Sequence, residues 1–221
     1  VVAARRHDLA RVDVDEHDRA PNGIGEHPQA AIGRDGVERH RELFGTQALG
    51  ALGAGRLLQE EWDEAAAALE EALPTMRDRR AGLVWEALVL ARLAQAYLGR
   101  GDAARALATA EEAVTVAQRQ GGRLYESEAH LALARVLLWT EDARSRKAIE
   151  DALARALALV EETGARVYEP FIRVELAALA RLTGDEATRR RELREAHRLF
   201  TEMGAPLQAA KLAPLLAEPK G

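Results

Sequence analysis

The chain has 221 residues and no cysteine, which excludes disulfides, thiolate metal sites and cysteine nucleophiles. Hydrophobic residues make up 48% but aromatic residues only 4%, so alanine and leucine dominate and favour helix over sheet. The net charge of −5, with both signs mixed, argues against a nucleic-acid-binding face, which would be basic. No apolar run reaches the roughly 20 residues that span a bilayer, and no signal peptide is present, so we expect a cytoplasmic protein without membrane contact.

Residues 1–24 show no lasting helical or strand period, and we predict a poorly ordered segment with a frayed helix over 8–18. The segment is dense in potential metal ligands, namely His7, Asp8, Asp13, Asp15, Glu16, His17 and Asp18. A calcium loop starting at Asp13 would need glycine at the position of Asp18 and glutamate at that of Ile24. We prefer a solvated polar tail to a metal site, and predict neither metal nor cofactor.

Paired helices are predicted from residue 25 onward. Residues 25–45 read as a degenerate first pair that closes at Gly45. The next helices are predicted over 46–59 and 63–78, with Pro74 cutting or kinking the second one.

The clearest pair spans residues 84–99 and 102–119, joined by a tight Gly-Arg-Gly-Asp turn. Leu93 and Tyr97 lie four residues apart, on one face of the first helix. Small residues such as Ala110 face them from the second helix and allow the backbones to approach closely. This is the design of an antiparallel helix pair.

The remaining helices follow the same alternation of helix and short turn. We predict them over 123–139, 146–163, 168–182 and 186–203. Residues 205–221 are predicted to form a C-terminal capping helix, over about 206–217, and a tail.

The helix pairs repeat at a regular period. The central alanines of successive second helices, Ala72, Ala113, Ala156 and Ala196, are separated by 41, 43 and 40 residues. A closing glycine follows eight residues later in three of the pairs, at Gly121, Gly164 and Gly204. Helix pairs at this period are typical of an all-α, right-handed α-solenoid.

Residues 90–114, LARLAQAYLGRGDAARALATAEEAV, resemble a tetratricopeptide repeat. The matching positions are Leu93, Ala94, Tyr97, Gly101, Ala106 and Ala113. The resemblance covers about residues 25–204, with Arg56 in place of an aromatic residue and Arg189 in place of a small one. Residues 169–213 are also similar to the C-terminal helical regions of large bacterial signalling proteins, the class III nucleotide cyclases and ATP-dependent transcriptional regulators.

Catalytic motifs are missing from the sequence. No Gly-Lys pair exists, so a phosphate-binding loop is excluded. The two serines, Ser127 and Ser145, have no glycine elbow around them. We therefore expect no enzymatic activity.

The resemblance implies that the first helix of each pair lines a concave groove. The predicted partner-binding residues are Leu88, Gln95, Glu128, Leu131, Arg135, Phe171, Val174 and Arg181. Gln47 and Ala91 map to the same face. This largely apolar mixture suits an amphipathic helix or an extended peptide. Alternatively, Leu88, Leu131 and Phe171 pack between neighbouring pairs.

These features predict a non-catalytic scaffold module for protein interaction in signal transduction, binding a partner helix or peptide in the groove. The alternative is a ligand-sensing segment of a multidomain nucleotide cyclase or ATP-dependent transcriptional regulator. A chain that begins at Val1 is expected either for a fragment of a longer protein or for a protein with an unusual start codon.

Overall fold

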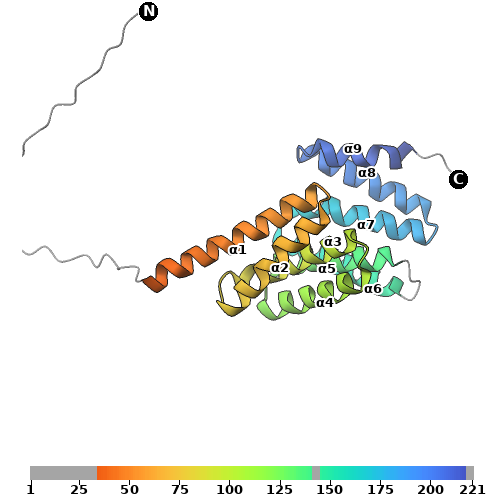
Figure 1. The fold of residues 1–221 in the computed structure, drawn as a ribbon. Helices are drawn as coiled ribbons and strands as arrows, with labels where there is room; N and C mark the ends of the chain where they lie inside the picture. The colour runs from red at the N-terminus through yellow and green to blue at the C-terminus, as the bar shows by residue number, and fades with distance from the viewer. Residues whose placement is uncertain (1–33, 141–144, 218–221) are drawn as a thin grey trace, which may run out of the picture.

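The computed structural model describes residues 34–140 and 145–217, and every described element is helical (Figure 1). The predictions for residues 1–24, including the His and Asp cluster, lie outside these ranges. The helices are α1 (Arg34–Leu58), α2 (Trp62–Asp78), α3 (Glu86–Gly99), α4 (Ala103–Gln120), α5 (Arg123–Trp139), α6 (Arg146–Thr163), α7 (Glu169–Leu182), α8 (Glu186–Glu202) and α9 (Pro206–Ala217). Two short 3-10 turns, η1 (Leu83–Trp85) and η3 (Arg166–Tyr168), lead into α3 and α7.

Neighbouring helices pack in pairs, α1 with α2, α3 with α4, α5 with α6 and α7 with α8. The final helix, α9, packs against α8. The first helices of successive pairs also contact one another, since α1 meets α3, α3 meets α5 and α5 meets α7. The pairing predicted from the sequence is therefore present across the described ranges.

Turn glycines and acidic caps explain where several helices begin and end. Gly101, between α3 and α4, has a φ of 78°, a left-handed conformation that glycine adopts without strain. The next residue, Asp102, caps α4 by accepting a hydrogen bond from the backbone N–H of Arg105 at 3.2 Å. The equivalent residue before α8, Asp185, accepts from the backbone N–H of Thr188 at 3.0 Å.

The predicted helix end at Gly45 is wrong, and α2 is not cut at Pro74. The helix expected to close at Gly45 continues, because α1 runs without a break from residue 34 to 58. Gly45 is not among the glycines with positive φ, so the backbone makes no C-terminal turn there. The predicted degenerate pair over 25–45 is thus partly the start of α1 and partly outside the described residues.

The second interruption was expected at Pro74, yet α2 continues through it to Asp78. A proline inside a helix removes one backbone hydrogen bond, at a cost of about 3 kcal/mol. Leu73 and Met76, on either side of the proline, are both buried and hold this end of the helix against the core. Packing therefore outweighs the local preference.

The core is built mainly from alanine and leucine. Ala94 of α3 and Ala106, Ala110 and Ala113 of α4 are fully buried, which lets these two helices approach closely. Gly53 serves the same purpose in α1, because a Cβ there would lie 2.5 Å from Leu69 Cγ of α2.

The helix pairs curve until the two ends of the assembly approach each other. Lys211 Nζ of α9 lies 3.4 Å from Glu60 Oε1 in the turn between α1 and α2. In Figure 1, α9 accordingly lies near the end of α1. Residues of α1 and α7 therefore come close enough to line the same cavity. Across the ranges described, no helix is both long enough and apolar enough to cross a membrane.

Candidate functional site

A cleft of about 270 Å³ lies where α1, α3, α5, η3 and α7 meet. We call it the central cleft. It is lined by Ala54, Leu57, Leu58, Arg92, Gln95, Glu128, Leu131, Arg135, Tyr168 and Phe171. Leucine and phenylalanine side chains form apolar walls, and three charged groups face the same space.

Glu128 of α5 is the most unusual of these groups. It is only 8% exposed, although it carries a carboxylate. Its Oε1 lies 3.6 Å from Arg92 Nε, beyond hydrogen-bond distance, and its Oε2 has no hydrogen-bond partner in the described structure. Burial raises the pKa of Glu128, and the opposing influences of Arg92, Tyr168 and Arg135 are smaller.

The two arginines of the cleft keep part of their donor capacity. Arg92 Nη1 donates a long hydrogen bond, 3.4 Å, to the carbonyl oxygen of Gly50. Arg135 Nε donates to Glu175 Oε1 at 2.7 Å, and its guanidinium lies 6.0 Å from the centroid of the Phe171 ring. A guanidinium offers five N–H donors, so both arginines have more donors than the described residues accept.

Tyr168, at the end of η3, contributes a neutral hydroxyl. Burial, followed by the negative charge of Glu128, raises the pKa of Tyr168 far above its ordinary value. The phenol therefore stays protonated, and its hydroxyl faces the Glu128 carboxylate as a hydrogen-bond donor.

Five of the predicted site residues meet in the central cleft, namely Gln95, Glu128, Leu131, Arg135 and Phe171. They come from three different first helices, as the repeat period requires. Leu88 and Gln47 line an adjoining cavity of about 240 Å³ between α1 and α3. Arg92 borders both spaces, so the two cavities are neighbours.

Val174 and Arg181 lie elsewhere on α7. Val174 packs against the core formed by α7, α8 and α9. Arg181 is exposed in the last turn of the helix, ten residues beyond Phe171. At 1.5 Å per residue this places it about 15 Å along the helix from the cleft.

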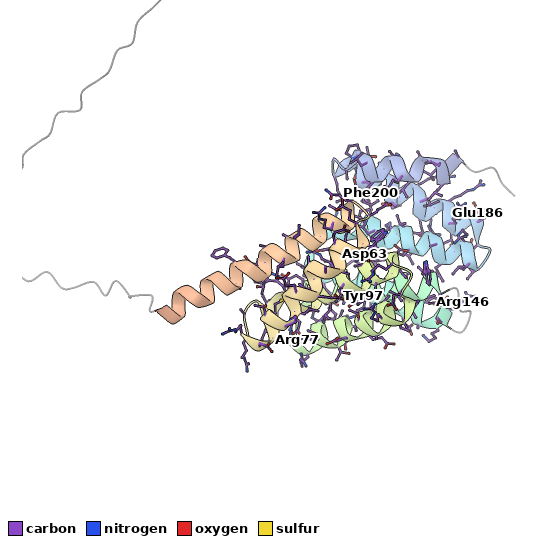
Figure 2. All side chains as sticks on the ribbon, in the orientation of Figure 1. Asp63, Arg77, Tyr97, Arg146, Glu186 and Phe200 are labelled. Carbon is purple, nitrogen blue, oxygen red and sulfur yellow. The ribbon has the colours of Figure 1, made fainter. Side chains whose placement is uncertain are left out.

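Leu131 and Phe171 both line the cleft and pack in the core. Leu131 is only 3% exposed and belongs to the cluster formed by α5, α6 and α7. The ring of Phe171 meets Phe200 of α8, labelled in Figure 2, edge to face at 4.9 Å between centroids. Packing between pairs, the alternative considered for these residues, therefore describes part of their role.

Sequence reasoning missed Arg92, Tyr168 and the three residues of α1. Arg92 could have been found, because it is a charge inside the most apolar stretch of the chain. Leu57 and Leu58 could not, because they reach the cleft only through the curvature that brings α1 towards α7.

Ion pairs occupy two further cavities. A shallow cavity of about 990 Å³ lies between α2, η1 and α4, at the end of the molecule where Figure 2 labels Arg77. There Arg77 pairs with Glu86 at 2.7 Å and with Glu112 at 2.6 Å. An arginine-rich cavity of about 470 Å³ on α7 and α8 is likewise neutralised, for example by the 2.6 Å pair between Arg198 and Glu195.

No protein-family model matches the chain, and no curated protein matches its sequence. Among the described residues, no three His, Asp or Glu side chains gather as a metal site would require.

Proposed function

We propose that the chain is a non-catalytic binding module, built as a right-handed α-solenoid of the tetratricopeptide type, with the central cleft as its binding site. The repeat period of 41, 43 and 40 residues and the successive contacts between first helices support this architecture. In such a stack the first helices would form the concave face, and the central cleft lies among them.

The observation that carries the proposal is the buried, unpartnered oxygen of Glu128. Leaving a buried polar group unsatisfied costs about 1–3 kcal/mol. The repeat does not require it, because Glu128 occupies the position that Leu88 and Phe171 hold in the neighbouring pairs, 40 residues before and 43 after. A costly carboxylate at a position suited to an apolar side chain is explained by a ligand that pairs with it.

The size of the cleft favours a small ligand over a whole helix. An α-helix is about 10–12 Å across with its side chains, which a cleft of about 270 Å³ does not accept. The volume of the cleft is close to the lower end of small-molecule pockets, which is roughly 300 Å³. We therefore favour the ligand-sensing role, in which occupancy of the cleft would regulate an attached domain.

An extended peptide is the second candidate. The adjoining cavity of about 240 Å³ shares Arg92 with the central cleft, so a short chain segment could occupy both. Leu88 and Gln47 would then contact the peptide, as the sequence analysis predicts.

A methyl NMR screen with small polar compounds and short peptides tests the proposal. We expect binders to shift the methyl signals of Leu57 and Leu131. Leu58→Glu at the rim should weaken binding at least tenfold, because the added charge lies beside the apolar wall. Leu207→Glu is a matched control, because Leu207 of α9 is also 77% exposed but lies outside the cleft. Shifts confined to other surfaces, or equal effects of both substitutions, would refute the assignment.

A further inference from the structure

The central cleft presents both signs of charge within a short distance. Arg92 Nε and Glu128 Oε1 are 3.6 Å apart, and Arg135 lines the same cleft. Glu175 offsets the charge of Arg135, so the four groups together are neutral. A ligand that suits this cleft carries no large net charge but has both a cationic and an anionic group.

The hydrogen bonds left open define what the ligand must provide. Glu128 Oε2 lacks a donor. Arg92 and Arg135 have spare N–H groups that lack acceptors within the described structure. A simple amine would satisfy the carboxylate but would sit beside two arginines. A simple carboxylate would suit the arginines but would face Glu128.

An ammonium and a carboxylate on one carbon atom meet both requirements at once. The two charges of such a ligand lie side by side, as do Arg92 and Glu128, whose closest side-chain atoms are 3.6 Å apart. Because those side chains are too far apart for a mutual hydrogen bond, a ligand displaces little when it pairs with each of them. Charge-assisted hydrogen bonds to both would be stronger than neutral ones.

The remaining walls determine the ligand's side chain. Leu57, Leu131 and Ala54 offer apolar surface. A cleft of about 270 Å³ is slightly smaller than typical small-molecule pockets, so it suits a compact ligand such as a single amino acid.

We infer that the central cleft binds a free α-amino acid with an aliphatic side chain. Its ammonium would donate to Glu128, its carboxylate would accept from Arg92 and Arg135, and its side chain would lie against Leu57 and Leu131. The inference rests on the proposed function, since it names the ligand class of the same cleft.

Isothermal titration of the intact chain with a matched chemical series tests the inference. The series is L-leucine, its decarboxylated analogue isoamylamine and its deaminated analogue 4-methylpentanoate. We expect L-leucine to bind at least tenfold more tightly than either analogue. Because the series uses the unaltered protein, its result does not depend on a variant that folds.

Two substitutions then localise the effect. Glu128→Gln keeps the shape of the side chain and should weaken leucine binding at least tenfold. Arg181→Gln, on the exposed end of α7, should leave it unchanged. The inference is overturned if Glu128→Gln leaves the affinity for L-leucine unchanged, or if isoamylamine binds as tightly as L-leucine.

The outcomes also separate the inference from the proposed function. If L-leucine does not bind while other compounds in the NMR screen shift the methyl signals of the cleft, only the ligand class is wrong. If nothing in either experiment reaches the cleft, both proposals fall.

Discussion

Glu128→Gln should make the unliganded protein more stable at neutral pH. The carboxylate is 8% exposed, and its Oε2 has no hydrogen-bond partner in the described structure. An unsatisfied buried group of this kind costs about 1–3 kcal/mol, and more when it is charged. Glutamine has the same shape, keeps an acceptor for Arg92 and removes the buried charge. We expect a gain of about 1–2 kcal/mol in the free energy of unfolding.

The pH dependence gives this prediction a sharper form. Arg92 of α3, Arg135 of α5 and Tyr168 of η3 face the carboxylate, yet burial outweighs them and raises the pKa of Glu128 above its ordinary value of 4.5. The charged form therefore destabilises the fold above the folded-state pKa. As the pH falls through that pKa towards 4.5, the unsubstituted protein regains stability. The advantage of Glu128→Gln should thus be largest near pH 7 and vanish below about pH 4.5.

Urea unfolding followed by circular dichroism at several pH values measures both effects. Glu161→Gln, at an exposed position of α6, is the control and should not change stability at any pH. A Glu128→Gln protein that is less stable at pH 7, or a difference that does not change with pH, would show that the carboxylate is well satisfied in the native state. Glu128 would then not require a ligand.

Two further predictions concern packing and a second buried group. Gly53→Ala should destabilise the fold by about 1–3 kcal/mol, because the new Cβ would lie 2.5 Å from a buried leucine of α2. In Gly55→Ala, in the same helix, the new Cβ meets nothing within 4 Å, so this variant should be more stable by about 0.5–1 kcal/mol. Equal urea midpoints for the two variants would contradict the close approach of α1 and α2 at Gly53. Burial lowers the pKa of His130; the charge of Arg155 lowers it further, and the charge of Glu126 opposes both effects. The free energy of unfolding should therefore fall as the pH drops below 6.5. His130→Gln should flatten that part of the urea midpoint profile, and an unchanged slope would refute the assignment.

Most helices could be predicted from local signals. The predicted bounds of α5 (Arg123–Trp139) and α6 (Arg146–Thr163) coincide with the structure. Apolar spacing, turn glycines and caps such as Asp102 act within one helical turn, so a short window of sequence contains them. At Pro74 the buried neighbours Leu73 and Met76 outweigh the local cost, whereas at Gly45 the glycine keeps a helical backbone and α1 continues.

The candidate site could be predicted only in part. Glu128 and Phe171 were identified because a nearly constant repeat period puts equivalent positions on one face, and Leu131 because it follows Glu128 by about one helical turn. Val174 was misplaced because α7 turns that side towards α8 and α9. Tyr168 was missed because it precedes α7, in a turn whose direction depends on packing.

The sequence by itself determined the helical class, the pairing of the helices and the face that holds most of the cleft. These follow from hydrogen bonds and apolar contacts between residues a few positions apart. Only the tertiary structure decided that α1 and α7 border one cleft and that Oε2 of the buried Glu128 has no hydrogen-bond partner among the described residues. The reason is that curvature accumulates from side-chain packing at every interface between pairs, over more than 100 residues, until Lys211 reaches Glu60.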